Sequence, residues 1–500
     1  MTSFRLTVKT VYAEANNIFK DVKHIVIYGI NENAITTKSV LTRDTEISYK
    51  VEAFIDPSGS VRKKQLDAIK FYNENELPNI FKRNNISELI ITDKSISPSR
   101  KQEIIDVCLE YDVKVLTLPE VHDWINGELS YRQIRKINIE DLLERPPINL
   151  NAKQIKKDIL NKTILVTGAA GSIGREIVLQ LTEYHPKNII IFDQAESPLY
   201  DLELELKEKL NFHNFDIVIG DVTNIVRINK LFHSFNPGIV YHAAAYKHVP
   251  MMEANPSEAV RTNVFGTSLL ANLAVRFKVE KFIMISTDKA VKPTSVMGAS
   301  KRIAEMYTQA MNSKNGTRFI TTRFGNVLGS NGSVIPLFRD QISKGGPVTV
   351  THPEITRYFM TIPEACQLVL EAGAMGKGGE IFIFDMGQSI KIVDLAKKMI
   401  MLSGLTLGSD IQIKYTGLRP GEKLYEELLN DEENTLPTHH PQIMIARERG
   451  FDLETLSVKV KELIAFSDSM DGLSIVKKMK EIAPEFKSRN SVYEQLDTEE

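Results

Sequence analysis

Apolar runs of strand length alternate with amphipathic stretches along the first part of the chain. The apolar runs lie at 22–28, 51–55, 89–92 and 113–116, and the patterns with helical spacing between them include 63–72 and 100–111. Strands that alternate with helices predict βαβ units, whose strands lie side by side in a parallel sheet. We therefore expect a small Rossmann-like α/β domain over residues 20–120.

The same alternation returns from residue 159 onward. The apolar runs of this second region lie at 163–166, 189–192, 217–219, 239–241 and 282–285. They predict a larger α/β domain over 159–450, again a doubly wound parallel sheet, with a smaller C-terminal substrate-binding portion.

Two segments interrupt this pattern. Residues 121–158 carry Arg132, Arg135 and Lys136 and then Pro146 and Pro147, which disfavour continued helix. A solvated linker is the simplest interpretation of this segment, and docking against the next domain is the alternative. Residues 451–500 have helical spacing at 475–482, and we expect them to form a peripheral helical appendage.

Composition narrows the class of protein. The 500 residues are 42% apolar and 25% charged, the net charge is -2, and no basic run is long enough to follow a phosphate backbone, so we expect no nucleic-acid partner. Cys108 and Cys366 lie far apart in apolar helical contexts, which favours a reducing, cytoplasmic compartment. The ten histidines show no metal-ligand spacing, and His439 and His440 are typical of a solvated turn. We expect no metal.

The start of the chain has a pattern of its own. No apolar run reaches the roughly 20 residues that span a bilayer, and no secretory signal precedes the first domain. Residues 4–12 alternate apolar with polar or basic side chains. This alternation indicates either a start cut from a longer protein or a peripheral membrane contact.

The first turn of the N-terminal domain resembles a dinucleotide loop only in part. Gly29 follows the first apolar run, but Asn31, Glu32 and Asn33 place side chains where a backbone would approach a pyrophosphate. We expect a nucleotide-free domain used for regulation or assembly. A weak nucleotide or effector site is the alternative.

The corresponding turn of the second domain, T-G-A-A-G-S-I-G-R at 167–175, is rich in glycine. Glycines at a strand-to-helix turn let the main chain close on a diphosphate, and the helix N-terminus supplies unpaired N–H groups. The expected cofactor contacts are Gly168, Ala170, Gly171, Ser172, Ile173 and Gly174. Asp193 ends the next strand, where a carboxylate accepts hydrogen bonds from ribose and repels a 2′-phosphate, which favours NAD over NADP.

Two later strand ends complete the predicted cofactor site. Asp221 and Val222 follow the third strand, where the adenine edge would lie. Ala243, Ala244 and Ala245 follow the fourth, and their small side chains would let a cofactor lie against the backbone.

Candidate chemistry gathers at 283–302. An apolar strand runs into Thr287, Asp288 and Lys289, which puts an acid and a base at the carboxyl end of a strand, where open α/β sheets bind their ligands. Met297 and Lys301 follow with the i, i+4 spacing that places both on one helix face.

These features together resemble the extended short-chain dehydrogenase/reductase family over roughly residues 160–450. The segments A-A-A-Y-K-H-V-P-M-M-E (243–253), S-T-D-K-A-V-K-P-T (286–294), R-F-G-N-V-L-G-S-N-G-S-V-I-P-L-F (323–338), T-H-P-E-I-T-R-Y-F-M (351–360) and R-P-G-E-K-L-Y-E-E-L (419–428) are similar to the long UDP-N-acetylglucosamine 4,6-dehydratases of bacterial capsule and glycan synthesis. The resemblance implies a UDP-sugar substrate and a homo-oligomer. Membrane helices commonly precede the first domain in that family, so this chain resembles the cytoplasmic part, either naturally soluble or truncated, with membrane association through a preceding segment.

One position departs from the wider superfamily. The usual Tyr-x-x-x-Lys pair uses a tyrosine phenolate as base, but Met297 stands at the tyrosine position, and a thioether cannot accept the proton in this way. Lys301 remains to hold the nicotinamide ribose. Met at this position is similar to the branch that retains configuration at C5.

The resemblance also implies roles for the site residues. Asp288 would be the acid at C6 and Lys289 the base at C5, with a pKa that falls toward neutrality beside Lys301, the nicotinamide cation and excluded water. Thr287 as a relay, or Asp288 itself, would take the C4 hydroxyl proton. The expected substrate contacts are Arg357 and Arg419 for the diphosphate, unless either forms a surface salt bridge instead, Glu422 for the uridine ribose, Asn326 and Ser333 for diphosphate or sugar, and Lys247 and His248 beside the sugar.

Two rival functions stay open. A nucleotide-sugar 4-epimerase uses the same fold and cofactor without losing water, although it needs no acid and base at C5 and C6. A cofactor-binding scaffold without turnover in a glycan-assembly complex is compatible with Met297.

Overall fold

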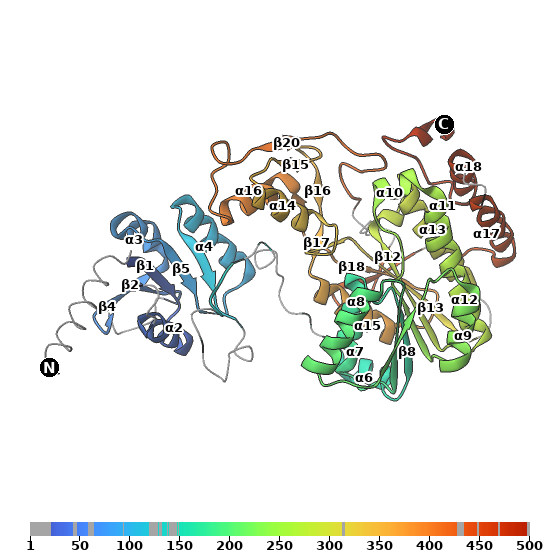
Figure 1. Ribbon diagram of the computed structural model, residues 1–500, viewed down its shortest axis with the longest axis horizontal. Coiled ribbons are helices and arrows are strands. Elements are labelled where there is room, and N and C mark those ends of the chain that lie inside the picture. The colour runs from blue at the N-terminus through green and yellow to red at the C-terminus, as the bar shows by residue number, and fades with distance from the viewer. Residues whose placement is uncertain are drawn as a thin grey trace, which may run out of the picture. The chain divides into compact units, whose positions relative to one another are not determined.

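A computed structural model describes residues 22–43, 48–58, 65–93, 95–119, 129, 133–137, 139, 148, 150–312, 316–427, 435–447, 450–468 and 471–497. The pattern at 4–12 and most of the expected linker lie outside these residues. The chain divides into two compact units, one from Met1–Pro146 with Lys397–Gln412 and the other from Pro147–Ala396 with Ile413–Glu500. Each unit has its own main sheet (Figure 1).

The first unit is an open α/β sheet. Its elements are β1 (Val22–Tyr28), α2 (Glu32–Arg43), β2 (Ser48–Asp56), β3 (Gln65–Leu66), β4 (Ile69–Asn73), η1 (Glu74–Glu76), α3 (Leu77–Asn84), β5 (Glu88–Ile91), α4 (Pro98–Glu110), β6 (Lys114–Thr117) and β7 (Arg135–Lys136). The strand order is β3-β4-β2-β1-β5-β6-β7, and the strands from β4 to β6 are parallel. The βαβ pattern expected for this region is therefore present.

The helix expected at 63–72 is wrong for the part of that stretch which the structure describes. There β3 pairs antiparallel with β4 across Asp67 and Ala68, whose φ angles of 47° and 68° are left-handed. Ile69 and Phe71 pack against the core of the first unit. Pairing of β4 with β2 and burial of alternate side chains outweigh the helical spacing of the sequence.

The second unit is built on a larger sheet of order β10-β9-β8-β11-β12-β13-β18-β22-β21, parallel from β10 to β18. Its first half holds α6 (Ala152–Ile159), β8 (Thr163–Thr167), α7 (Ser172–Thr182), β9 (Asn188–Asp193), α8 (Glu196–Leu204), η4 (Glu205–Lys209), β10 (Phe215–Ile219), α9 (Ile225–Phe235), β11 (Ile239–His242), α10 (Val249–Ala254), α11 (Pro256–Ala259), η5 (Val260–Gly266), α12 (Thr267–Arg276), β12 (Lys281–Thr287), η6 (Asp288–Ala290) and α13 (Val296–Met311).

The second half of this unit adds shorter strands beside the main sheet. The elements are β13 (Arg318–Phe324), β14 (Asn326–Val327), α14 (Val334–Ser343), β15 (Val348–Val350), β16 (Thr356–Arg357), β17 (Phe359–Met360), α15 (Ile362–Met375), β18 (Ile381–Phe384), β19 (Ile390–Lys391), α16 (Ile392–Leu402), β20 (Ile413–Tyr415), β21 (Thr435–Pro437), β22 (Ile443–Ala446), α17 (Leu453–Ser467), α18 (Gly472–Ile482) and η8 (Val492–Leu496). The boundary between the two units falls inside α16.

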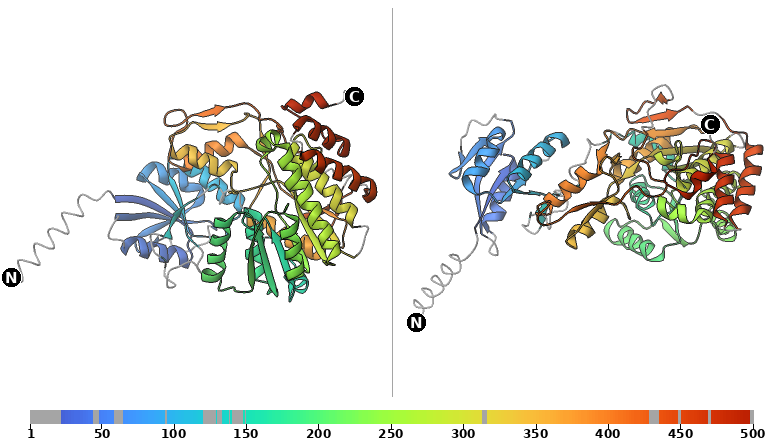
Figure 2. Two further views of the ribbon diagram at one scale, coloured as in Figure 1. Left: turned by 45° about the vertical axis from the view of Figure 1, so that its right-hand side comes forward. Right: turned by 90° about the horizontal axis from the view of Figure 1, so that it is seen from above.

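Apolar side chains cover both faces of the main sheet of the second unit. Leu165 and Phe282 point into one core with α9, α12 and α13, while Ile164 and Ile283 point into the other with α6, α7 and α15 (Figures 1 and 2). Strands buried on both faces read as continuous apolar runs, as the sequence shows. The parallel arrangement brings the carboxyl ends of β8, β11 and β12 to one edge.

Two segments belong more firmly to the second unit than expected. Ile155 of α6, placed in the linker from sequence, is buried in the core with α15, as is Ile159 at the predicted start of the second domain. Val460 of α17 and Met479 of α18 are buried in the same core as Ile303 of α13. The C-terminal region is helical as expected, but the view that it is peripheral is wrong.

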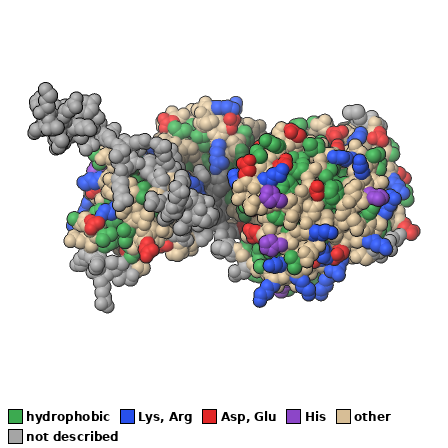
Figure 3. All heavy atoms as spheres, turned by 60° about the horizontal axis from the view of Figure 1, so that its bottom comes forward, with side chains coloured by type: hydrophobic (Ala, Val, Ile, Leu, Met, Phe, Trp, Pro, Cys, Tyr) green, Lys and Arg blue, Asp and Glu red, His purple; other side chains and the backbone are tan. Residues whose placement is uncertain are grey.

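On the face of the second unit drawn in Figure 3, Lys and Arg side chains are interspersed with Asp and Glu. Within the described residues, no helix combines the length and apolar character needed to cross a membrane. Cys108 and Cys366 are both free and buried, and burial raises the pKa of each thiol.

Candidate functional site

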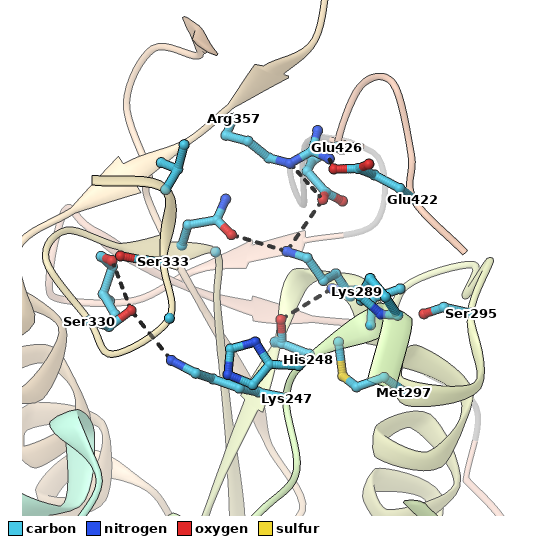
Figure 4. A pocket seen from close by; sticks show the side chains of 18 of the residues that line it. Lys247, His248, Lys289, Ser295, Met297, Ser330, Ser333, Arg357, Glu422 and Glu426 are labelled. Atoms are coloured by element: carbon cyan, nitrogen blue, oxygen red, sulfur yellow. Dashed lines mark hydrogen bonds and ion pairs between the residues drawn. The ribbon is translucent and has the colours of Figure 1, made fainter. Parts of the chain in front are cut away.

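A cleft of about 670 Å³ opens at the carboxyl ends of the central strands of the second unit (Figure 4). Of the residues expected from sequence, its lining includes Gly168, Gly171, Ser172, Ile173, Gly174, Ala243, Ala245, Lys247, His248, Thr287, Lys289, Met297, Lys301, Asn326, Ser333, Arg357, Arg419 and Glu422. Ala170, Asp193, Asp221, Val222, Ala244 and Asp288 lie outside that lining. The expected cofactor and substrate groups therefore share one cavity, with the two strand-end carboxylates of β9 and β10 set apart from it.

The glycine-rich turn packs too closely for side chains at two of its glycines. Gly168 has a φ of 68°, and a Cβ there would lie 2.5 Å from the backbone nitrogen of Ala244. A Cβ on Gly174 would lie 2.1 Å from the carbonyl oxygen of Gly168. Gly171 is different, because a Cβ there would meet only that carbonyl oxygen, at 3.2 Å, and this residue is the N-cap of α7 without a side-chain cap. The first turn of α7 thus keeps N–H groups available for an anion.

Asp193 ties the turn to the next strand. Its Oδ2 accepts a hydrogen bond from the backbone N–H of Ala170 at 3.0 Å, and its Oδ1 accepts one from Ala195 at 3.0 Å. A carboxylate has lone pairs for further donors, so these bonds leave capacity for ribose hydroxyls. Asp221 instead accepts from the backbone of Thr223 at 2.8 Å, and Val222 is buried against Gly266.

The acid and base expected at the end of β12 lie in direct contact. Lys289 Nζ donates to Asp288 Oδ1 at 3.0 Å, and Thr287 Oγ1 donates to the same oxygen at 2.8 Å. Asp288 Oδ2 is buried and has no hydrogen-bond partner within the described part of the chain. An ideal Cβ on Gly325 would lie 3.0 Å from this oxygen, so glycine leaves room beside it. One oxygen of Asp288 is therefore engaged and the other is unpaired.

Helix α13 carries Met297 and Lys301 into the cleft, one turn apart. Ser295 caps the helix by accepting a hydrogen bond from Gly298 N at 3.1 Å, which fixes where the helix begins. Lys301 Nζ donates to the carbonyl oxygen of Ile285 at 2.7 Å. Burial lowers the pKa of Lys301 to about 8, although Glu305 opposes the shift.

Opposing effects set the pKa of Lys289. Burial lowers its pKa, but the carboxylates of Asp288 and Glu426 outweigh burial, so the pKa is raised above its ordinary value. The ammonium lies 3.3 Å from Glu426 Oε1 and 3.3 Å from Asn326 Oδ1. Two buried carboxylates thus stabilise the charged form, and the fall of this pKa toward neutrality, which is expected beside a bound cofactor and with water excluded, stays a prediction.

Arg357 and Arg419 reach the cleft with different degrees of exposure. Arg357 is buried, donates to the carbonyl oxygen of Lys423 at 2.8 Å, and lies 3.4 Å from Glu426 and 3.5 Å from Glu422. A surface salt bridge is therefore the wrong description of Arg357. Arg419 is more than half exposed and lies 3.3 Å from the same carboxylate of Glu422. Figure 4 shows Arg357 and Glu422 on one side of the cleft.

A second group of polar side chains lines the opposite wall. Lys247 Nζ donates to Ser330 Oγ at 3.4 Å, and the buried Ser333 Oγ has no partner among the described residues. Burial lowers the pKa of Lys247. Burial and then the charges of Lys247 and Arg419 lower the pKa of His248. An anion bound here would relieve this repulsion between neighbouring cations.

Sequence reasoning missed Glu426, Ser330 and Lys423, all of which line the cleft. Glu426 is the most important omission, because one of its oxygens contacts both Lys289 and Arg357. Glu426 and Lys423 lie inside the 419–428 segment on which the resemblance partly rests, so the segment could have been searched for them. Within the part of the chain that the structure describes, no three His, Cys, Asp or Glu side chains gather as metal ligands.

Comparison with known proteins gives one family and several named relatives. The family model described as polysaccharide biosynthesis protein matches residues 164–448. Over 369 residues the chain is 51% identical to the capsular polysaccharide biosynthesis protein CapD of Staphylococcus aureus, covering 73% of this chain and 61% of that protein. Over 282 residues it is 38% identical to a UDP-glucose 4-epimerase of Rickettsia canadensis, covering 55% of this chain and 79% of the epimerase.

A solved structure extends the comparison to three dimensions. The X-ray structure of Pen from Bacillus thuringiensis matches with a TM-score of 0.53 and 33% sequence identity, covering 61% of this chain and 98% of that one. The chain spans less than two thirds of the length of CapD. The family match covers more than half of the chain and contains the glycine-rich turn, the Asp288–Lys289 pair and the arginine segment. The chain therefore belongs to the polysaccharide biosynthesis protein family.

Proposed function

We propose that the protein removes water from a UDP-N-acetylhexosamine, with UDP-N-acetylglucosamine the favoured substrate, to form the 4-keto-6-deoxy sugar nucleotide for bacterial surface glycan or capsule synthesis. The observation that carries this proposal is the contact of the buried Asp288 with Thr287 and Lys289, which line a cleft between the glycine-rich turn and a cationic wall. A 4,6-dehydration needs one acid and one base at neighbouring carbons, and this cluster contains both.

The glycine-rich turn fits NAD as the cofactor. The uncapped first turn of α7 suits the pyrophosphate, and Asp193 suits the ribose hydroxyls while disfavouring a 2′-phosphate. Lys301, held by Ile285 O, would contact the nicotinamide ribose. NAD, when bound, supplies a hydride acceptor for C4 and returns the hydride to C6.

The contact between Thr287 and Asp288 suggests how the first proton moves. The C4 hydroxyl would pass its proton to Thr287 Oγ1, which passes its own proton to Asp288 Oδ1, 2.8 Å away. Asp288 is then protonated when the C6 hydroxyl must leave as water. In this order Thr287 and Asp288 together remove the C4 proton, and the carboxylate that accepts the proton later donates it.

Lys289 is the proposed base at C5. It begins as an ammonium held by Asp288 and Glu426, so it must first release one proton to solvent before it can act as a base. Protonation of Asp288 removes one of the two stabilising negative charges, and exclusion of water by the bound sugar lowers the pKa of the lysine further. The amine then takes the C5 proton as water departs from C6, and returns a proton to C5 after C6 receives its hydride. The sugar thus loses one water and no electrons.

A 4-epimerase is the second candidate, and the 38% identity to a UDP-glucose 4-epimerase favours it. Both reactions begin with oxidation at C4. An epimerase gains nothing from an acid and a base at C5 and C6, so the buried contact of Asp288 with Lys289 argues for dehydration.

The test is incubation of the protein with NAD and UDP-N-acetylglucosamine, followed by mass spectrometry and NMR of the product. We expect a product lighter by one water, with a 6-methyl signal and retained configuration at C5. A product of unchanged mass with altered configuration at C4 would support the epimerase instead. Absence of conversion of UDP-N-acetylhexosamines would overturn the proposal.

A further inference from the structure

Three segments far apart in sequence are joined by main-chain hydrogen bonds beside the substrate side of the cleft. We call residues Lys487–Tyr493 the C-terminal brace. The backbone N–H of Lys487 donates to Pro293 O at 3.1 Å, and that of Arg489 donates to Thr294 O at 3.2 Å. On its other side, Arg489 O accepts from Gly421 N at 2.7 Å. The brace therefore connects the segment before α13 to the turn that contains Gly421.

A buried carboxylate links the brace to the start of α13. Glu253 Oε1 accepts a hydrogen bond from Val296 N at 2.6 Å, and Glu253 Oε2 accepts one from Ser491 Oγ at 2.6 Å. The hydroxyl of Tyr493 donates to the backbone oxygen of Glu253 at 3.2 Å. Glu253 is only 7% exposed, so each donor satisfies an oxygen that water does not readily reach. The position of the first residues of α13 thus depends on the last residues of the chain.

The three segments pack closely against one another around Gly421. Gly421 has a φ of 77°, and a Cβ on it would lie 2.7 Å from Ser295 Cβ and 3.0 Å from Glu253 Oε1. Thr294 Oγ1 also donates to Gly421 O at 3.2 Å. Thr294, Ser295 and Gly421 all line the cleft. A displacement of the brace would therefore be transmitted directly to the cavity wall.

The brace is itself held firmly. Lys480 of α18 donates to Ser488 Oγ at 2.9 Å and to Asp497 Oδ1 at 2.5 Å. Ser488 N donates to Asp497 Oδ2 at 3.1 Å. Figure 1 shows the C-terminal end beside α10 and α18, whose buried side chains belong to the main core. These contacts make the brace a fixed support rather than a loose tail.

We propose that the C-terminal brace positions the substrate side of the cleft, and that Ser491 and Glu253 are positioning residues for nucleotide-sugar binding. The brace fixes the start of α13 and the 419–422 turn, which carries Arg419 and Glu422. This inference rests on the proposed function only for the identity of the sugar nucleotide. The glycine-rich turn follows β8 in another part of the cleft, and Lys301, further along α13, is held by Ile285 O of β12, so cofactor affinity should be independent of the brace.

The decisive variant is Ser491→Ala, which removes the hydroxyl that donates to Glu253. We expect the affinity for UDP, measured by titration calorimetry, to fall by about threefold to thirtyfold, since one hydrogen bond to a charged group is lost and only part of its effect reaches the cleft. The KM for the UDP-sugar should rise by a similar factor with kcat less affected, and NAD affinity should not change. Ser491→Thr, which keeps the hydroxyl, should restore UDP binding.

Thr455→Ala is the matched control, because Thr455 Oγ1 also donates to a carboxylate, Asp452, in the C-terminal region but on an exposed surface. It should change neither affinity. Glu253→Gln is the second variant, should Ser491→Ala fail to fold, and it should weaken UDP binding in the same direction.

Three outcomes distinguish the proposals. Unchanged UDP affinity in Ser491→Ala overturns the proposal that the C-terminal brace positions the substrate side of the cleft. Equal losses of UDP and NAD affinity also overturn it, because they indicate general destabilisation. Weakened UDP binding in a protein that never releases water upholds the brace and refutes the dehydratase.

Discussion

Thr-Asp-Lys follows a parallel strand in both units, after β5 in the first and at the end of β12 in the second. In the first unit Thr92 Oγ1 donates to Tyr28 O, and Asp93 Oδ1 accepts from the backbone and hydroxyl of Ser95 at 2.9 and 2.7 Å. In the second unit Thr287 donates to Asp288, which also holds Lys289. The same residue types serve a local turn in one unit and form a buried acid–base cluster in the other.

The glycine turns before α2 and α7 also differ between the two units. Asn31 Oδ1 accepts a hydrogen bond from Ala34 N at 3.0 Å, and Glu32 lies in the first turn of α2. The N-terminus of α2 is thus capped by its own side chain and repels anions. Helix α7 begins at Gly171 with neither a side-chain cap nor an acid in its first turn. The difference favours the nucleotide-free interpretation of the first unit.

The comparison teaches that a strand-end Thr-Asp-Lys motif forms an acid–base cluster only where it is buried and where residues from later segments of the chain contact it. Asp288 is buried and faces Lys289 beside a cleft, whereas Asp93 bonds only to an exposed serine in the contacts described above. The following predictions test this contrast, beginning with the largest effect.

Gly171→Val should abolish NAD binding. A Cβ at this position meets only one carbonyl oxygen within the protein, so the fold should persist while the isopropyl group blocks backbone approach to the pyrophosphate. Calorimetric titration with NAD, with circular dichroism to confirm folding, measures the effect. Asn31→Ala in the first unit is the control and should leave NAD affinity unchanged. Normal NAD binding by Gly171→Val would show that the pyrophosphate does not bind at this turn.

Asp288→Asn and Lys289→Met should each reduce turnover by about 10²- to 10⁴-fold, the range for a positioned acid or base. Lys289→Met should block exchange of the C5 proton with deuterated solvent, whereas Asp288→Asn should slow both C4 oxidation and loss of water, because Asp288 accepts the C4 proton and later protonates the C6 hydroxyl. NMR and mass spectrometry follow both steps. Asp93→Asn, the matched change in the first unit, should leave turnover intact. Full C5 exchange in Lys289→Met would show that another group is the base.

Glu426→Gln should shift the acidic limb of the pH profile of kcat/KM to lower pH. Burial lowers the pKa of Lys289, but Asp288 and Glu426 raise it overall, so removal of one carboxylate charge lowers it. Because the neutral amine is the base, activity is lost as pH falls through this pKa, and a lower pKa extends activity to lower pH. Glu422→Gln is the control, since Glu422 contacts Arg357 as Glu426 does. A shift to higher pH, or an equal shift in both variants, would contradict this account.

Asn31→Ala should have the smallest effect, a loss of about 1 kcal/mol in the stability of the first unit, because one helix cap is removed. Urea unfolding followed by far-ultraviolet circular dichroism measures it. Turnover should be unchanged. Tighter binding of a nucleotide by this variant would mean that the side-chain cap had closed a latent site.

The cofactor side of the second unit could be predicted from sequence because its signals are local. Gly168, Gly171 and Gly174 lie within a few residues of one another, and Asp193 follows at the end of the next strand. The placement of Met297 and Lys301 could be predicted equally well, since helical spacing alone puts both on one face. The contact of Asp288 with Lys289 also follows from their adjacency in the sequence. Of these two residues, Lys289 lines the cleft and Asp288 does not.

The charge state of Lys289 could not be predicted in the same way. It depends on Glu426, which belongs to a segment far along the chain, and sequence spacing carries no distance between them. The strands at 65–73 were missed because pairing with β2 decides their conformation. The C-terminal helices were misplaced because an amphipathic pattern shows that one face is buried without showing what covers it.

The C-terminal brace also bears on the order in which the protein can assemble during synthesis. The glycine-rich turn and the strands around it are complete once about half of the chain has been made, since β8, β9 and β11 are close in sequence. The substrate wall needs Ser491 to meet Glu253, which lies 238 positions earlier in the sequence. A nascent chain can therefore fold its cofactor half early, whereas the wall that receives the sugar nucleotide closes only after the C-terminal brace has left the ribosome.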